Sequence, residues 1–380
     1  MKYFLSSLLL VFIYSIFSCG YQQEPNKEEY PKDAVNYVDV KYAKGFTIEQ
    51  HSNFKVITLR NAWKGEETNY QYVLYDNTKP KGFEGAVFVK TPIQSIACMS
   101  LTHIAFIDKL NQNNTITAIS GCDYVSNSEI KEKIKQGIIK EIGQEQQLNY
   151  EMLIDNKPDV FMAYGINESS KKNLNKLKQL GLSVVLNAEY MENHPLGQAE
   201  WIKFIAAFYE LDKEAAEIFL QIEQEYNELK NFVSKVETKP SVFVGMPWNG
   251  VWYLAGGESF QAQLMRDAGA NYLWKDNQET SNFTVDKEVI IDKSLNSDYW
   301  INLNSYTTIN EVIAYDHKFK NFKAVKNQQL FNNNKRVNSL GGNDFWESGV
   351  INPQLILKDL VTIFHPELID EPLYYYKKLD

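Results

Sequence analysis

The chain has 380 residues, 44% hydrophobic and 23% charged, so it is long enough for two globular domains and is neither disordered nor fibrous. Its 48 Asp and Glu outnumber its 39 Lys and Arg, and the net charge of −9 argues against nucleic acid as a partner, because such a surface repels phosphate. Aromatic residues reach 13%, and their flat faces suit a large planar ligand.

The N-terminus has the pattern of a secretory signal. A short basic start at residues 1–3 precedes the apolar run 4–17, which is too short to span a bilayer permanently. The run ends at Ser18-Cys19, which resembles the site cut by lipoprotein signal peptidase, although Phe17 is bulkier than the residue usual in that pattern. We therefore predict a signal peptide over 1–18, lipidation of Cys19 and a lipid-anchored linker over 19–37. Plain secretion is the alternative.

Two other cysteines, Cys98 and Cys122, would then lie in an oxidising compartment. A disulfide between them would close a loop of about 24 residues and stabilise the fold by roughly 3 kcal/mol in the loop-entropy model. Cys98, however, falls in the middle of an apolar run that predicts a buried strand. We expect two buried free thiols, with the disulfide as the alternative.

An N-terminal lobe is predicted over residues 38–211, and it opens with a β-rich segment over 38–91. The β-branched and aromatic runs there lie at 37–42, 54–59, 70–75 and 86–89. Apolar strands then alternate with helices: strands are expected at 93–99, 116–119, 160–163 and 184–186, and helices at 102–110, 129–136, 150–155 and 171–180. Continuous apolar strands separated by helices predict a parallel sheet that is covered on both faces.

One long helix is predicted over residues 212–237. Its apolar residues form an unbroken stripe with spacings of three and four, at positions 215, 219, 222, 226, 229, 233 and 236. Asp212 is a suitable cap, and Pro240 lies beyond the end. A helix of this length spans roughly 37 Å, which is enough to connect two lobes.

A C-terminal lobe is predicted over residues 238–380. Strands are expected at 241–245, 251–255, 299–303 and 336–340, and helices at 258–268 and 353–364. Asn249-Gly250, directly before the second strand, is a strong hairpin-turn signal. The fold class is therefore α/β: two Rossmann-like lobes with mostly parallel sheets, joined by one long α-helix, with a β-rich N-terminal extension.

An internal echo supports two similar lobes. Residues 149–155 and 286–292 each contain a helix cap, a glutamate two residues on, and an Ile-Asp pair three and four residues after that glutamate. The copies lie on opposite sides of the long helix, 137 residues apart.

Catalytic signatures are absent from the sequence. It contains no phosphate-binding loop, no Gly-x-Ser-x-Gly elbow and no Cys-x-x-Cys pair. The five histidines are scattered, and no two have the spacing of helical metal ligands. We predict no enzyme, no cofactor and no metal site; a Zn site assembled from distant residues is the alternative.

At this point the sequence resembles the substrate-binding lipoproteins of ABC importers for iron-siderophores, haem and cobalamin. The resemblance covers roughly residues 92–365 and is most specific at Asp267-Ala268-Gly269-Ala270-Asn271-Tyr272-Leu273-Trp274. Weaker matching segments in the expected order are 92–127, 148–151, 157–159, 250–253, 256–257 and 285–291.

This resemblance implies a ligand cleft between two rigid lobes, and cleft walls form where parallel strands end. Aromatic side chains near nearly every such end would stack on a large chelate or corrinoid, although packing within a lobe is the competing explanation for each. The tyrosines could also coordinate ferric haem. The predicted ligand-binding residues are Thr102, His103, Tyr124, Tyr164, Trp248, Asn249, Trp252, Asp344, Phe345 and Trp346.

In the family, one glutamate on each lobe pairs with arginines of the permease, and Glu151 and Glu288 match those positions. The expected partners are therefore an ABC permease dimer with its ATPase, a small-molecule chelate, and a membrane reached through the lipid anchor. We expect a monomer in a periplasmic or otherwise extracytoplasmic location. Near the first turn of a helix, a carboxylate is also favoured by the helix dipole alone.

Two other functions remain as alternatives. A transition-metal (Zn or Mn) binding protein would share the fold, but scattered histidines count against it. A secreted hydrolase would need two acids facing one cleft, and Asp123 with Asp344 is the pair that the sequence offers.

Overall fold

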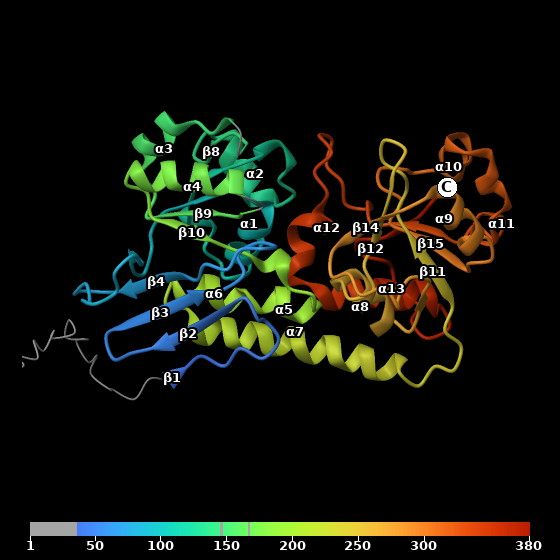
Figure 1. Cartoon of the computed structure of the whole chain (residues 1–380), viewed down its shortest axis with the longest axis horizontal. Coiled ribbons are helices and arrows are strands. Elements are labelled where there is room, and N and C mark those ends of the chain that lie inside the picture. Colours follow the sequence, from blue (N-terminus) through green and yellow to red (C-terminus); the bar gives the residue numbers. More distant parts are fainter. Residues whose placement is uncertain (1–35, 145–146, 166–167) are drawn as a thin grey trace, which may run out of the picture.

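The computed structural model describes residues 36–144, 147–165 and 168–380, arranged as two lobes above a common base (Figure 1). The predicted signal peptide, the lipidation site Cys19 and nearly all of the predicted linker lie outside these residues.

The β-rich segment forms a sheet of its own, in the order β1-β2-β3-β4-β5. All neighbours are antiparallel except β4 and β5. The predicted strand at 37–42 is wrong beyond Tyr37, because the backbone N–H groups of residues 41–45 bond to the buried carboxylates of Glu192 and Glu200 instead of to a strand. The strands are β1 Asn36–Tyr37, β2 Phe46–Gln50, β3 Phe54–Leu59, β4 Tyr70–Tyr75 and β5 Val87–Lys90.

The N-terminal lobe contains the predicted parallel sheet, in the order β10-β9-β6-β7-β8. Cys98 and Cys122 are both free thiols, as expected; Cys98 is buried in β6, whereas Cys122 is only half-buried and not buried as expected. The strands are β6 Ile96–Cys98, β7 Ile116–Ile119, β8 Lys140–Glu141, β9 Val160–Ala163 and β10 Val184–Leu186. The helices are α1 Leu101–Lys109, α2 Ser128–Lys135, α3 Tyr150–Asn156 and α4 Glu168–Gln179.

The long helix is α7, Asp212–Val233, which runs along the base beneath both lobes (Figure 1). Its buried positions Ala215, Phe219, Ile222 and Tyr226 follow the predicted stripe. The helix is shorter than expected, and Asp212 does not cap it. Asp212 is instead the first helical residue and forms an ion pair with Lys55 of β3. Two short buried helices precede it, α5 Pro195–Glu200 and α6 Ile202–Ala207.

The C-terminal lobe has a second, mostly parallel sheet in the order β13-β11-β15-β16-β17, in which β17 is antiparallel. A small antiparallel pair, β12-β14, lies beside it. The strands are β11 Ser241–Val244, β12 Trp252–Ala255, β13 Asn271–Tyr272, β14 Asn282–Val285, β15 Tyr299–Ile301, β16 Leu330–Asn332 and β17 Lys377–Lys378. The helices are α8 Phe260–Asp267, α9 Lys287–Ser294, α10 Ile309–Tyr315, α11 Lys323–Lys326, α12 Asp344–Glu347 and α13 Pro353–Phe364.

The strand predicted at 336–340 is wrong. The strand of this region is β16, and residues 336–343 form a loop with a single bridge between Val337 and Asn343. Asn338 organises the loop, because its Oδ1 accepts hydrogen bonds from the backbone N–H groups of Leu340 and Gly342 at 2.9 Å each. Side-chain bonding of this kind competes with strand pairing.

The two lobes correspond in topology. In each lobe, one central strand (β6 or β11) pairs in parallel with a later strand (β9 or β15). A short helix precedes that later strand in both lobes, α3 before β9 and α9 before β15. These helices carry the two copies of the sequence echo, so the echo reflects equivalent positions in two similar folds.

Candidate ligand cleft between the lobes

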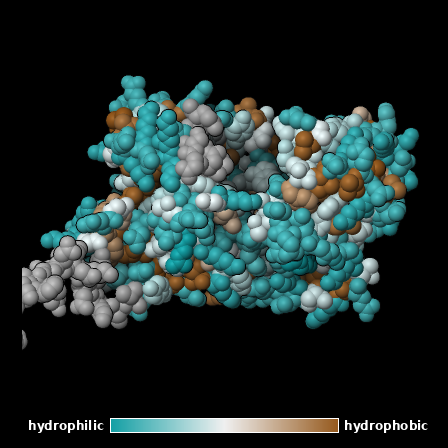
Figure 2. Space-filling view, viewed as in Figure 1, coloured by the Kyte–Doolittle hydropathy of each residue, from teal (hydrophilic) through white to brown (hydrophobic). Residues whose placement is uncertain are grey.

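The candidate site lies between the lobes, beyond the carboxyl ends of their parallel strands. The space-filling view shows a notch between the two lobes at the upper edge of the molecule (Figure 2). The segments that follow β6, β7 and β9 come from the N-terminal lobe, and those that follow β11 and β16 come from the C-terminal lobe.

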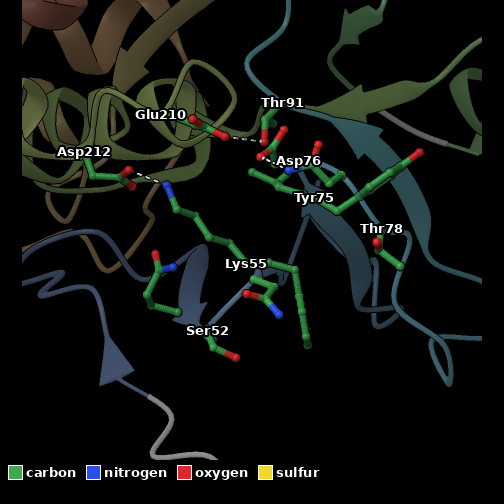
Figure 3. Close-up of a pocket in the computed structure, with 13 residues that line it drawn as sticks. Ser52, Lys55, Tyr75, Asp76, Thr78, Thr91, Glu210 and Asp212 are labelled. Carbon is green, nitrogen blue, oxygen red and sulfur yellow. Dashed lines mark hydrogen bonds and ion pairs between the residues drawn. The ribbon is translucent and has the colours of Figure 1, made fainter.

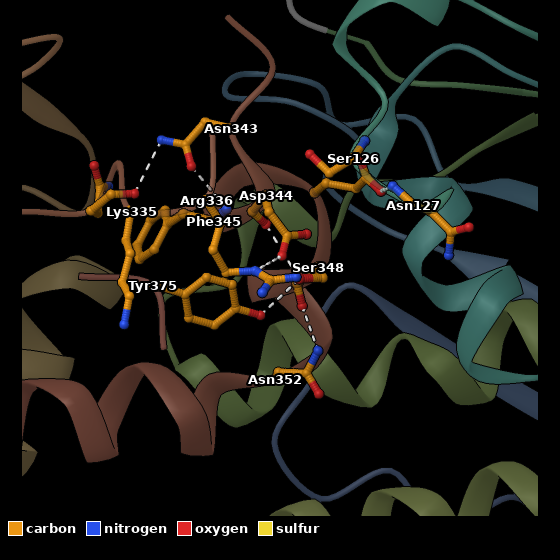
Figure 4. A network of polar contacts seen from close by, with 12 residues as sticks. Ser126, Asn127, Lys335, Arg336, Asn343, Asp344, Phe345, Ser348, Asn352 and Tyr375 are labelled. Atoms are coloured by element: carbon orange, nitrogen blue, oxygen red, sulfur yellow. Dashed lines mark hydrogen bonds and ion pairs between the residues drawn. The ribbon is translucent and has the colours of Figure 1, made fainter. Parts of the chain in front are cut away.

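Hydrogen bonds connect the two lobes through the segments that follow β7 and β16 (Figure 4). The carboxylate of Glu347 accepts the backbone N–H groups of Ser126 at 2.5 Å and Asn127 at 2.9 Å. Asn338 Nδ2 donates to the backbone oxygens of Asp123 and Val125 at 3.0 Å each. The segment after β7 is thereby fixed to the segment after β16.

Glu347 has an unusual electrostatic position in this contact. Burial raises the pKa of its carboxyl to about 7, with a smaller contribution in the same direction from the nearby Asp344 and with the two backbone N–H donors opposing the shift. Its charge state therefore changes near neutral pH.

Three of the predicted aromatic residues have exposed side chains. Trp248 is 66% exposed, Trp346 52% and Tyr124 46%. Trp248 and Asn249 belong to the predicted tight turn: Trp248 and Val251 exchange both backbone hydrogen bonds, and Asn249 and Gly250 have positive φ. Tyr124 follows β7, and its backbone oxygen faces Gly342 so closely that a Cβ there would lie 2.1 Å away.

Trp252 is a correction to the predicted site. It is 1% exposed, its indole N–H donates to the Val244 oxygen at 3.2 Å, and its ring stacks on Trp300 at 6.0 Å. The alternation of β12 explains the difference, since Trp252 faces the core and Tyr253, 47% exposed, faces outward. The aromatic residue that β12 presents to the surface is thus Tyr253, which the sequence analysis did not select.

Phe345 and Asp344 are also corrections, because both are buried. Phe345 packs edge-on against Tyr375 and Tyr376 at 5.7 and 5.9 Å. Asp344 pairs with Arg336, whose Nε lies 2.5 Å from its carboxylate (Figure 4). Asp344 is therefore buried and paired with Arg336, and it does not face the cleft as the hydrolase alternative requires.

His103 does not reach the cleft. It is fully buried in α1, and burial lowers its pKa to about 3, so the imidazole is neutral. Neither ring nitrogen has a hydrogen-bond partner among the residues that the structure describes. The neighbouring Thr102 is half-buried and donates to the buried Glu189 at 2.5 Å. Tyr164, at the end of β9, is also half-buried.

A loop of the β-rich extension, residues 60–69 between β3 and β4, also borders the lobes. Trp63 in this loop packs on Gly165, directly after Tyr164, where an added Cβ would lie 2.3 Å from the indole Cε3. The sequence analysis missed this residue because the extension lies outside the recognised resemblance. A tryptophan between Asn61 and Gly65, in an otherwise polar loop, was the available signal.

A separate polar cavity of about 650 Å³ lies on the extension, lined by residues at the ends of β2, β3 and β4 and by the start of α7 (Figure 3). Lys55 reaches across it to Asp212, and Thr91 donates to Glu210 at 3.0 Å. These contacts join the extension to the start of α7, so we assign the cavity to this junction.

Glu151 and Glu288 are both exposed, in the first turns of α3 and α9. Asn149 caps α3 through a hydrogen bond from Met152 N, whereas Asp286 makes no such bond to α9. The two glutamates therefore occupy equivalent exposed positions, one per lobe.

No group of three or more His, Cys, Asp or Glu residues suited to hold a metal ion occurs in the described part of the chain. Within the same residues, no helix is both long and apolar enough to cross a membrane.

Two curated relatives are uncharacterized lipoproteins of Methanocaldococcus jannaschii. One is 28% identical over 288 residues, which covers 73% of this chain and 67% of the relative. The other is 25% identical over 372 residues, which covers 94% and 90% respectively.

Solved structures share the fold. A possible iron-binding (periplasmic solute-binding) protein of Staphylococcus epidermidis gives a TM-score of 0.57 at 22% identity, covering 72% of this chain and all of that chain. A Helicobacter pylori protein with Ni(II) bound gives 0.57 at 17%, covering 77% and 91%. A periplasmic heme binding protein of Pseudomonas aeruginosa gives 0.54 at 13%, covering 72% and 93%.

A model of the periplasmic binding protein family matches residues 96–336, more than half of the chain. The match runs from β6 through α7 to the loop after β16, so it includes both sides of the cleft and the helix beneath them. This match and the similar solved structures confirm the predicted fold class. A family of binding proteins also agrees with the prediction that the chain is not an enzyme. The chain belongs to the periplasmic binding protein family, the solute-binding components of ABC-type transporters.

Proposed function

We propose that the protein captures a metal chelate or tetrapyrrole-like ligand, such as an iron-siderophore, haem or cobalamin, in the inter-lobe cleft and delivers it to an ABC permease. The observation that carries this proposal is the set of exposed aromatic side chains on segments that border the cleft: Tyr124 of the N-terminal lobe, and Trp248 and Trp346 of the C-terminal lobe. Exposed tryptophans supply large stacking faces, and they suit a ligand with an extended flat surface.

The names of structurally similar proteins agree with this ligand class. They name a possible iron-binding protein, an Fe3+-hydroxamate transport system and a heme-binding protein. Because the identities are 22% or lower, they support the choice of compounds to test and do not select one.

For delivery, Glu151 and Glu288 would contact the permease dimer, which works together with its ATPase. Their equivalent positions on α3 and α9 suit a partner that is itself made of two similar halves. Tethering through a lipid on Cys19 would keep the protein at an extracytoplasmic membrane surface, and the lipoprotein relatives support this location.

A thermal-shift screen tests the ligand class. Ferric siderophores of the hydroxamate and catecholate types, haemin and cobalamin would each be added to the purified protein. A ligand at 100 times its Kd should stabilise the folded state by about 2.7 kcal/mol and raise the Tm. A rise with Zn²⁺ or Mn²⁺ alone, and with none of the chelates, would reject the proposal in favour of a metal-ion binder.

A further inference from the structure

A second cavity, of about 540 Å³, lies where the β-rich extension meets both lobes. Its walls come from three parts of the chain: the extension, the segment before α5, and the C-terminal lobe around α8. The family match begins at residue 96, so one whole wall lies outside the matched part of the chain. The lining residues used below are Lys44, Trp63, Lys64, Glu192, Glu258 and Arg266.

The extension wall is fixed in place. Trp63 is 3% exposed and packs on Gly165, while the hydroxyl of Tyr190 donates to the backbone oxygens of Ala62 and Gly165. Lys64 reaches the other lobe, with its Nζ 3.9 Å from Glu279. The loop therefore spans the gap between the lobes with a defined backbone position.

Glu66 fixes the far side of the same loop. Its buried carboxylate accepts hydrogen bonds from Thr68 N at 2.8 Å, Tyr70 Oη at 3.1 Å and Lys171 Nζ of α4 at 3.2 Å. These bonds outweigh burial and hold the pKa of Glu66 at about 2. The wall is preorganised, as a binding surface needs to be.

Three basic side chains and two acidic ones line the cavity, although the whole chain carries −9. Lys44 is exposed, and its ammonium group interacts electrostatically with Glu192. Arg266 donates to Gln263 Oε1 at 2.9 Å and to Gly257 O at 3.0 Å, which orients the guanidinium without neutralising it.

The acidic groups of the cavity do not cancel these charges. Glu192 is buried, and its Oε1 accepts the backbone N–H groups of Lys44 and Gly45 and the indole N–H of Trp201. Burial also raises the pKa of Glu192, which disfavours its negative charge. Glu258 is the other carboxylate in the lining, against Lys44, Lys64 and Arg266, and Lys64 is paired with Glu279.

We propose that this cavity is an anion subsite that binds carboxylate groups of a di- or tricarboxylate, and that the β-rich extension exists to build it. The oriented guanidinium of Arg266 and the ammonium group of Lys44 suit carboxylate oxygens, which accept charge-assisted hydrogen bonds. The inference rests on the proposed function, because in that setting the subsite holds the carboxylate arms of a chelate whose body occupies the aromatic cleft.

Isothermal titration calorimetry with citrate alone tests the subsite. The wild type should bind citrate, K44M should weaken binding at least fivefold, and R266M should weaken it further. Binding should also weaken as salt rises. The matched control is K90M, which removes an exposed lysine from the end of β5 and should leave citrate affinity unchanged. Lys44 holds Glu192 through its backbone N–H, so K44M keeps that bond.

Wild-type protein that gives no citrate binding at millimolar concentration, or K44M that binds citrate as tightly as K90M does, would overturn the subsite. A W346A variant separates the two proposals: it should lose affinity for the chelate found by the screen and keep its affinity for citrate. If a chelate binds in the screen and citrate does not bind, the proposed function stands and the subsite falls.

Discussion

In the C-terminal lobe, some aromatic side chains lie in the core and others lie on the surface. Trp252 and Trp248 lie four residues apart, yet one is buried against Trp300 and the other is 66% exposed. The sequence placed both near a strand end but could not tell which face of β12 would be buried, because that depends on packing against β15 and on the segment around Phe319.

Truncation should separate the two tryptophans. W252A leaves a large cavity in the core and should destabilise the protein by about 3–5 kcal/mol, whereas W248A should change stability by about 0.5 kcal/mol or less. Urea unfolding followed by circular dichroism measures both. Equal losses in the two variants would contradict the burial assigned here.

Glu347 predicts a pH dependence of stability. Its folded pKa of about 7 lies above its ordinary value of 4.5, so the folded state binds more protons than the unfolded state between these values. Its contribution to the free energy of unfolding is therefore fully present below about pH 4.5 and is lost as the pH rises through 7. E347Q should remove this part of the change in Tm between about pH 5 and pH 8. An unaltered pH profile in E347Q would argue against the raised pKa.

At the scale of elements, local pattern predicted most of the α/β core. The apolar runs at 116–119, 160–163 and 184–186 are strands with the expected bounds, and α13 matches its predicted range. The strand expected at 336–340 failed because Asn338 bonds to its own loop and to the other lobe, a tertiary effect that propensity does not contain. Strand β2 was missed although Phe46 and Ile48 alternate, since polar residues interrupt the run.

The fit of the extension loop against β9 gives a sharp test at this scale. G165A places a methyl group against the Trp63 ring and should destabilise the protein by about 1–3 kcal/mol through overpacking. W63L should relieve that clash, so the penalty of G165A should be smaller in the W63L background. A double-mutant cycle measured by urea unfolding gives the coupling, and strict additivity would show that the two residues do not touch.

At the scale of the whole molecule, the two lobes are held together at several points. Glu347 and Asn338 join them through the segments that follow β7 and β16, Lys64 approaches Glu279 near the extension, and α7 runs beneath both. These ties favour small relative movement of the lobes, so a permease would read the positions of two fixed surfaces. The long helix and the echo predicted two lobes joined by a helix. The sequence did not predict the contacts of Glu347 and Asn338 with the other lobe, because they depend on tertiary packing.

Two lobes that move little would hold Glu151 and Glu288 at a fixed separation, which suits the proposed docking to a permease. E151A and E288A should each slow ligand uptake in whole cells and weaken docking in a salt-sensitive way, and the double variant should abolish transport, while ligand affinity stays unchanged. The control is E217A, which removes an exposed glutamate from α7. Normal transport by the double variant would leave only the helix-dipole explanation for these residues.

The central claim, that an aromatic cleft between the lobes holds the ligand, is tested most directly by the affinity of single variants for the chelate identified in the screen. W248A and W346A should each weaken binding by about 2 kcal/mol, or roughly thirtyfold in Kd. F232A, which removes an exposed aromatic ring from α7, should leave affinity at the wild-type value. Wild-type affinity in both tryptophan variants would contradict the account.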